Sequence, residues 1–352
     1  MAKSGGKVAY YAFLDRCGLE IEGLSHFSLP DLNEKFRSFK ADSLPASRIK
    51  IKIGPFVPDL AGTTNVDHQY FIRRSYLYFQ ESLPGMDFSA EIQGLEEEVT
   101  EVRFHLTRKS RLSAANLLYP DAALHAYVLQ PLLECKLSGQ GLFLMHAGGV
   151  AKDGRASLFV GRGGSFKTTY CYRHVQKGFE FLGDDLVMFD REKVYPFPIH
   201  AAYFDYHIRQ GLNSESDLVG ARKIAAIFHL YNPPAPSFKL SGPAVPTEVT
   251  VIHPREEWAA PTLRPISLSL AVDKINRNNR MERSSSVPSK YQVGNFLNAY
   301  GLIFPDNVYS GIQAQSLACL ERLLAGSKAR LLETDSRWHE ENLAALAAKL
   351  LD

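Results

Sequence analysis

The stretch Gly161-Arg162-Gly163-Gly164-Ser165-Phe166-Lys167-Thr168 is the most informative pattern in this 352-residue chain. It lies between an apolar run, residues 156–160 (ASLFV), and a stretch of helical composition, residues 168–176 (TTYCYRHVQ). Small residues let backbone N–H groups turn toward phosphate oxygens, and the helix N-terminus adds the positive end of its dipole. The order strand, glycine-rich loop, helix therefore predicts a phosphate-binding loop.

The roles within this loop follow from side-chain chemistry. Lys167 can reach the outer phosphates of a nucleotide, and the hydroxyl of Thr168 can bind Mg²⁺. The residues predicted to contact the nucleotide are Gly161, Arg162, Gly163, Gly164, Ser165, Phe166, Lys167, Thr168 and Thr169.

One position departs from the usual pattern G-x-x-x-x-G-K-[ST], because Phe166 stands where glycine is expected. If this position needs a positive φ or a close approach to phosphate, phenylalanine has a steric penalty there. A bulky residue could also permit nucleotide binding but misplace the γ-phosphate. The alternative interpretation of the whole stretch is an ordinary strand–turn–helix with a surface lysine.

Two consecutive acids, Asp184 and Asp185, interrupt the apolar run 179–189 (FEFLGDDLVMF). Adjacent residues of a strand point to opposite faces, so two buried carboxylates in a core strand are costly. A strand end beside the phosphate loop would remove that cost. One carboxylate could then hold Mg²⁺, and the other could accept a proton from an attacking hydroxyl.

A single histidine, His146, lies in the apolar run 142–150 (LFLMHAGGV). A lone histidine in such a run is usually a satisfied core residue. Here the turn signal Lys152-Asp153-Gly154-Arg155 follows, and then the strand that leads into the loop. This pattern predicts a hairpin that places His146 near the edge of the loop.

Taken together, His146, the loop with Lys167 and the pair Asp184-Asp185 resemble the HPr kinase/phosphorylase-like proteins. The phrases MHAGGVAKDG, GRGGSFKTT and GFEFLGDDLVMFD are similar to a subgroup that also occurs in peptide-modification gene clusters, and the resemblance covers about residues 141–200. It implies an α/β fold with a P-loop HPr-kinase/PEP-carboxykinase-like core. It also implies ATP and Mg²⁺ as cofactors.

The resemblance implies roles for individual residues. Asp184 is expected to be the base, His146 lies against it, and Thr168 and Asp185 bind Mg²⁺. The downstream R-G-[apolar]-G segment of the family is not found; Arg209-Gln210-Gly211-Leu212 is at most a remnant. Phosphorylase activity and the carrier protein HPr as acceptor are therefore not expected.

The sequence predicts two domains. Residues 1–115 contain short alternating runs at 48–53, 69–79, 88–92 and 99–106, which favour a small β-rich domain. Residues 116–352 form the predicted P-loop domain. Within it we expect strands at 248–253, 266–272 and 328–332, helices at 221–230, 313–324 and 336–351, and a mobile polar loop at 276–289.

Composition excludes several classes of protein. A net charge of +2 gives no support for nucleic-acid binding, and no apolar run reaches the 18 residues of a membrane span. The four cysteines are scattered, and His200, His207, His229 and His253 lack a compact ligand geometry, so we expect free thiols and no structural zinc. With no signal-peptide pattern, the expected location is the cytoplasm.

The leading hypothesis is an ATP-dependent kinase that phosphorylates a hydroxyl, with a serine of a protein or peptide as the expected acceptor. A nucleotide-binding regulatory or accessory module without transfer activity is one alternative, and a small-molecule kinase is another. Members of the family often assemble, so a homo-oligomer is a further expectation.

Overall fold

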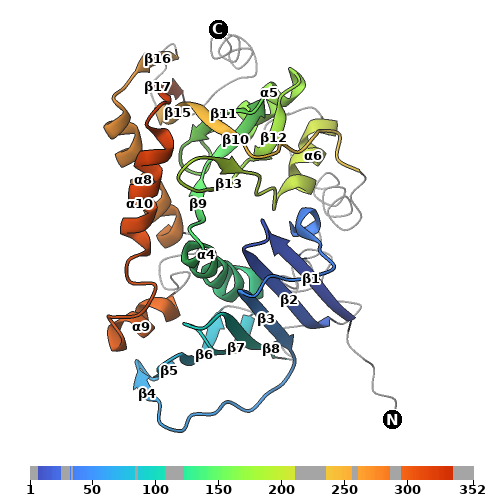
Figure 1. The fold of residues 1–352 in the computed structure, drawn as a ribbon, viewed down its shortest axis with the longest axis vertical. Helices are drawn as coiled ribbons and strands as arrows, with labels where there is room; N and C mark the ends of the chain where they lie inside the picture. The colour runs from blue at the N-terminus through green and yellow to red at the C-terminus, as the bar shows by residue number, and fades with distance from the viewer. Residues whose placement is uncertain are drawn as a thin grey trace. The chain divides into compact units, whose positions relative to one another are not determined.

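The computed structural model describes residues 7–24, 32, 35–83, 86–107, 123–210, 235–255, 261–285 and 295–335 (Figure 1). The chain divides into two compact units. The first comprises Met1–Gly141 and Ser286–Gln313, and the second comprises Leu142–Ser285 and Ala314–Asp352. The predicted boundary near residue 115 differs from this division, because the chain enters the second unit at Leu142 and returns to the first at Ser286.

The first unit is built on an eight-stranded sheet with the order β1-β2-β3-β8-β7-β6-β5-β4. Strands β2, β3 and β8 are parallel to one another, and the remaining neighbours are antiparallel. The strands are β1 (Lys7–Phe13), β2 (Cys17–Leu24), β3 (Arg48–Ile53), β4 (Thr64–Val66), β5 (Tyr70–Arg73), β6 (Tyr76–Leu83), β7 (Met86–Gln93) and β8 (Val99–Leu106). The helices are a 3₁₀ turn η1 (Arg37–Phe39), a π-helix η2 (Leu124–Leu129), α4 (Gln130–Gly139) and α9 (Asn295–Ile303).

Alternation of apolar residues places the central strands of this sheet. Strands β3 and β8 coincide with the runs expected from the sequence, and Ile49 and Ile51 of β3 are buried. The run 69–79 is not one strand but a hairpin, β5–β6, whose turn contains Ser75 at φ +57°. Serine is uncommon in this conformation, and the turn contains neither glycine nor proline. The sequence therefore carries no signal for this turn.

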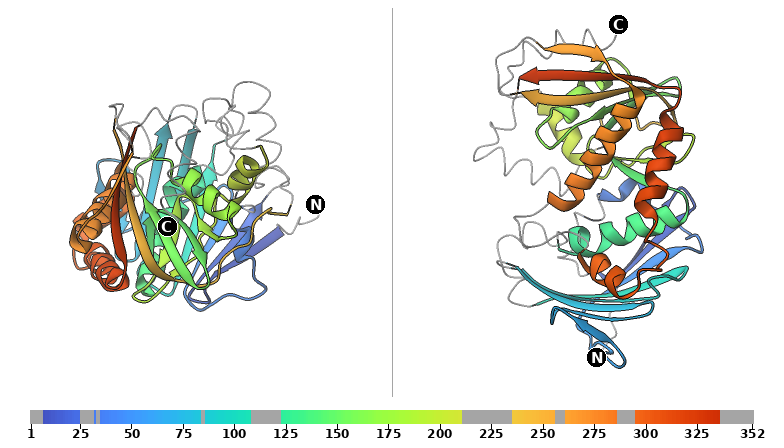
Figure 2. Two further views of the ribbon diagram at one scale, coloured as in Figure 1. Left: turned by 90° about the horizontal axis from the view of Figure 1, so that it is seen from above. Right: turned by 90° about the vertical axis from the view of Figure 1, so that its left-hand side faces the viewer.

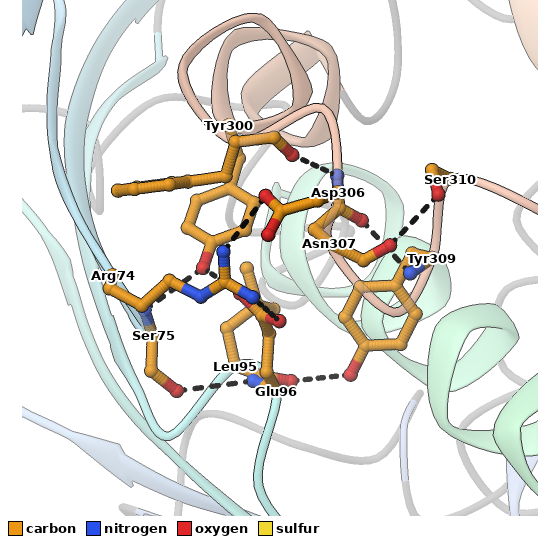
Figure 3. Close-up of polar contacts among 10 residues, drawn as sticks. Arg74, Ser75, Leu95, Glu96, Tyr300, Asp306, Asn307, Tyr309 and Ser310 are labelled. Atoms are coloured by element: carbon orange, nitrogen blue, oxygen red, sulfur yellow. Dashed lines mark hydrogen bonds and ion pairs between the residues drawn. The ribbon is translucent and has the colours of Figure 1, made fainter.

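Residues 295–313 are fixed to this sheet by a network of polar contacts (Figure 3). The hydroxyl of Tyr300 accepts a hydrogen bond from the backbone N–H of Ser75 at 2.9 Å and donates one to Glu96. Arg74 pairs with Glu96 at 2.9 Å and with Asp306 at 3.0 Å. The ring of Phe296 in α9 stacks on Phe79 in β6, with ring centroids 5.3 Å apart. The returning segment is therefore part of the core of the first unit.

The described residues of the second unit form two sheets. A six-stranded sheet has the order β12-β10-β11-β15-β17-β16, and a three-stranded sheet has the order β14-β13-β9. Strands β11, β15 and β17 are parallel. The strands are β9 (Phe143–His146), β10 (Gly148–Lys152), β11 (Arg155–Val160), β12 (Glu180–Gly183), β13 (Leu186–Phe189), β14 (Val194–Tyr195), β15 (Val245–Arg255), β16 (Thr262–Pro265) and β17 (Lys328–Asp335).

Helices cover both faces of the six-stranded sheet. They are α5 (Lys167–Gln176), α6 (Ala201–Gln210), α8 (Leu268–Ser285) and α10 (Ile312–Leu324). Leu158 and Val160 of β11 share a buried apolar cluster with residues of α8 and α10, which Figure 2 shows along one side of the sheet in orange and red. Phe159, on the opposite face of β11, belongs to a second cluster with residues of α5 and α6. This layering makes the second unit a mixed α/β structure, as predicted.

Several expectations for this unit are confirmed. The turn 152–155 joins the antiparallel strands β10 and β11, and β15, β17 and α10 lie where strands and a helix were expected. The predictions of helices at 221–230 and 336–351 fall outside the described residues.

Two predictions are wrong, because residues 268–285 form the helix α8 rather than a strand followed by a mobile loop. The apolar residues at 266, 268, 270 and 272 alternate as in a strand, but Leu270 is 39% exposed. Burial instead follows the helical spacing of Ala271, Val272 and Ile275. In the parts of the chain that the structure describes, no helix is long and apolar enough to cross a membrane.

Candidate functional site

The glycine-rich loop connects the end of β11 to the first residue of α5. A Cβ on Gly161 would lie only 2.4 Å from Oγ of Ser165 and 3.0 Å from the carbonyl oxygen of Ile252, so only glycine fits there. The backbone N–H of Ser165 donates to the carbonyl oxygen of Arg162 at 3.0 Å, which closes a turn within the loop. The strand–loop–helix order predicted from the sequence is therefore present.

Phe166 is the N-cap of α5 and has the left-handed conformation, with φ +66° and ψ +19°. A residue with a Cβ is disfavoured in this region by about 1–2 kcal/mol. The loop thus has the positive φ that the usual glycine provides, and phenylalanine bears the penalty. Its ring packs against the apolar cluster that contains Phe159 and Tyr170, which offsets part of the cost.

Lys167 is buried and turns back toward its own loop. Its Nζ donates to the carbonyl oxygens of Gly161 at 2.7 Å and Arg162 at 3.1 Å. Burial lowers the pKa of Lys167, while the nearby carboxylates of Asp185, Glu282 and Asp184 oppose this effect. The loop and the acids therefore lie within electrostatic reach of one ammonium group.

Asp184 and Asp185 lie between β12, which belongs to the six-stranded sheet, and β13, which belongs to the three-stranded sheet. Asp184 is buried close to the side chain of Thr168 in the first turn of α5. Burial raises the pKa of Asp184 to about 7, and the charge of Asp185 adds to the increase. Thr168 thus contacts Asp184, whereas the sequence analysis paired it with Asp185 at the metal.

Asp185 is more accessible, with 42% of its side chain exposed, and it faces His146. His146 is the last residue of β9, and its Nδ1 lies 3.2 Å from Oδ1 of Asp185. Burial lowers the pKa of His146, with the charge of Asp185 acting in the opposite direction. The expected placement of His146 beside an acid is therefore seen, but its partner is Asp185 rather than Asp184.

Helix α8 supplies residues that the sequence analysis missed. The backbone N–H of His146 donates to Oδ1 of Asn279 at 2.9 Å, and Nδ2 of Asn278 donates to the carbonyl oxygen of His146 at 3.2 Å. Both asparagines are buried, and their amide groups form hydrogen bonds with the backbone at the end of β9, as buried polar groups generally require. Polar residues on a helix usually face water, so their burial was not evident from the pattern alone.

Glu282, one turn further along α8, contacts the loop itself. Its Oε1 lies 3.0 Å from Nε of Arg162 and accepts a hydrogen bond from the backbone N–H of Gly163 at 3.3 Å. The same oxygen lies 3.8 Å from Nε2 of His146. Loop, histidine and α8 therefore meet at this carboxylate.

His200 is another residue found only in the structure. Its Nε2 lies 3.8 Å from Oδ2 of Asp185, whereas His146 faces the other carboxylate oxygen, Oδ1. In the sequence it belonged to a set of scattered histidines with no ligand spacing, so no local signal linked it to the acids.

The donor set is suited to Mg²⁺ and a phosphate chain. Mg²⁺ prefers oxygen ligands and is commonly held by one or two carboxylates with substrate phosphates and water. Thr168 and Asp184 supply such oxygens, and the buried Oγ of Ser165 has no hydrogen-bond partner among the described residues. Within the described ranges, no group of three or more His, Cys, Asp or Glu side chains is arranged to hold a metal ion.

Comparison with known proteins does not assign this chain to a family. No protein-family model matches it, and a search of curated proteins found no significant similarity. The function is therefore inferred from the geometry of the loop, the acid pair and His146.

Proposed function

We propose that this protein is an ATP-dependent kinase that transfers a phosphoryl group to a hydroxyl. The observation that carries the proposal is the convergence on one helix N-terminus: Lys167 and Thr168 begin α5, and the side chain of Thr168 lies close to Asp184, which precedes Asp185. Phosphoryl transfer requires mainly positioning and charge stabilisation rather than covalent chemistry by the protein. A helix N-terminus, a lysine and two carboxylates supply both.

The contacts favour a division of roles between the two acids. Asp184, buried against Thr168, is suited to help hold Mg²⁺, which would neutralise charge on the phosphates. Asp185 is accessible and paired with His146, so it is suited to accept the proton of the acceptor hydroxyl as the oxygen attacks phosphorus. This assignment reverses the order expected from the resemblance, in which Asp184 was the base.

The acceptor class comes from the resemblance to the HPr-kinase-like proteins, which implies a serine of a protein or peptide. The observed side chains support hydroxyl activation in general, since a carboxylate paired with histidine serves any alcohol. A serine-containing peptide and a small-molecule alcohol are therefore the two acceptor classes to test first.

The test is transfer from γ-labelled ATP in the presence of Mg²⁺ and serine-containing peptides, with ATP binding measured in parallel. We expect Asp185→Asn to bind ATP as the unmodified protein does and to lose at least about 100-fold in transfer rate, as is typical for a general base. His200→Gln, at 3.8 Å from the same carboxylate, is the matched control and should lose much less. Full transfer by Asp185→Asn would exclude it as the base.

A nucleotide-binding module without transfer activity is the second candidate, and the conformation of Phe166 favours it. A bulky residue at φ +66° next to Lys167 alters the surroundings of the phosphates without removing backbone donors from the loop. Tight ATP binding with no transfer to peptide or small-molecule alcohols would support this alternative over a kinase.

A further inference from the structure

The carboxylate of Glu282 lies where the loop presents its donors to an anion. A single oxygen, Oε1, is 3.0 Å from the guanidinium Nε of Arg162 and 3.3 Å from the backbone N–H of Gly163. The charge of Glu282 also acts on Lys167, whose pKa it raises against the effect of burial. A backbone N–H of the loop, a guanidinium and an ammonium are the groups that bind phosphate oxygens.

The position of Glu282 is fixed by its helix. Asn278 and Asn279, on the preceding turn of α8, bond to the backbone of His146, which holds α8 against the end of β9. Arg162 also contacts the neighbouring residue, with its Nη1 3.5 Å from Sδ of Met281. The contact between the loop and Glu282 is therefore part of a packed arrangement and not an isolated surface pair.

We infer that Glu282 is an internal competitor that occupies the anion position of the loop and must be displaced when a phosphate chain binds. This inference rests on the proposed function, since it concerns the same loop. A phosphate oxygen and the carboxylate cannot both accept from the N–H of Gly163 and pair with Nε of Arg162. The measured affinity is then the intrinsic affinity multiplied by the fraction of molecules in which Glu282 does not occupy the loop.

The size of the effect follows from the contacts that must break. A hydrogen bond to a charged group contributes more than a neutral one, and an ion pair with a half-exposed arginine adds little. Removing the charge of Glu282 should therefore strengthen phosphate binding by about 10-fold, the change that corresponds to one such contact. Glutamine keeps the shape of the side chain and removes only the charge.

The experiment is a calorimetric titration of ATP with Mg²⁺, and separately of inorganic pyrophosphate, into the full-length protein and its Glu282→Gln variant. Asp273→Asn is the matched control, because Asp273 is a carboxylate on the same helix that pairs with Arg277 and not with the loop. We expect Glu282→Gln to bind both probes about 10-fold more tightly. The control should bind as the unmodified protein does.

The outcomes separate this inference from the proposed function. Equal or weaker binding by Glu282→Gln would overturn the inference, and weaker binding would mean that Glu282 holds the loop in its binding shape. Transfer activity in the same samples would leave the kinase proposal standing. Tighter binding without transfer to any alcohol would support the inference and count against the kinase. Absence of binding in both proteins would overturn both.

Discussion

Nζ of Lys167 lies 2.7 Å from the carbonyl oxygen of Gly161 and donates a hydrogen bond to it. The two residues stand at opposite ends of the glycine-rich loop, so this bond ties the loop into a ring. The ammonium group of the lysine donates to backbone oxygens of its own loop. A bound phosphate chain would compete for the same ammonium group.

We expect Lys167→Ala to abolish phosphoryl transfer and leave the fold intact. The alanine variant loses the only buried ammonium group of the described site, while removal of a buried charge relieves a desolvation cost. Transfer from labelled ATP measures the first effect, and circular dichroism with a urea titration measures the second. Lys167→Met, which keeps most of the length of the side chain and removes its charge, is the control for lost packing. Full activity in either variant would contradict the proposed mechanism.

The backbone strain at Phe166 can be measured by comparing two substitutions. Phe166→Gly and Phe166→Ala both remove the ring, and they differ only in the Cβ that clashes at φ +66°. We expect the glycine variant to be more stable by about 1 kcal/mol, because alanine is disfavoured both at a positive φ and at the N-cap of a helix. The free energy of unfolding in urea decides this, and a more stable alanine variant would show that the position is not strained.

Asp184 should make the protein more stable when it is neutral. Its folded pKa of about 7 is above its ordinary value of 3.8, so its favourable contribution is full below about pH 4 and is lost as the pH rises through 7. Asp184→Asn should therefore match the unmodified protein near pH 4 and exceed it by about 1–4 kcal/mol at pH 8.

Unfolding in urea at these two values of pH checks the prediction. Because the variant removes the carboxylate charge proposed to hold Mg²⁺ beside Thr168, it should also lose Mg²⁺-dependent ATP binding, so stability and function change in opposite directions. A variant that is less stable at pH 8 would contradict the buried, desolvated state of this carboxylate.

Tyr300→Phe tests the polar network that fixes residues 295–313 to the sheet of the first unit (Figure 3). The change removes the hydroxyl that joins Glu96 to the backbone of Ser75 and keeps the buried ring. We expect the free energy of unfolding to fall by about 1–3 kcal/mol, since Glu96 loses a donor in a largely buried place. Tyr10→Phe, at a residue that is 39% exposed, is the control and should change it by less than about 0.5 kcal/mol.

Local patterns were sufficient for much of this fold. Strands β3 and β8 follow from alternating apolar residues, and the order of β11, loop and α5 follows from the glycine pattern. Even the strain at Phe166 could be anticipated, because the position where a glycine is usual requires a positive φ. Each of these features depends on residues close together in the sequence.

Features that depend on distant residues could not be predicted. Helix α8 contains polar residues that are buried only because they bond to His146, more than 100 positions earlier in the chain. Glu282 likewise has its partners in the loop, so nothing in its own surroundings marks it as a site residue. Asp184 lies near Thr168, and Asp185 faces His146. The directions of these two side chains cannot be predicted from the Asp-Asp dipeptide alone.

The return of residues 286–313 to the first unit has a consequence for how the protein is made. During synthesis, the strands that end at Leu106 emerge long before Phe296 and Tyr300. Phe79 and Glu96 therefore cannot form their contacts with these two residues until late in synthesis. The six-stranded sheet of the second unit is also completed late, because β17 lies between β15 and β16. Domains generally fold as they emerge from the ribosome. Here neither hydrophobic core can be completed until these late segments have been synthesised.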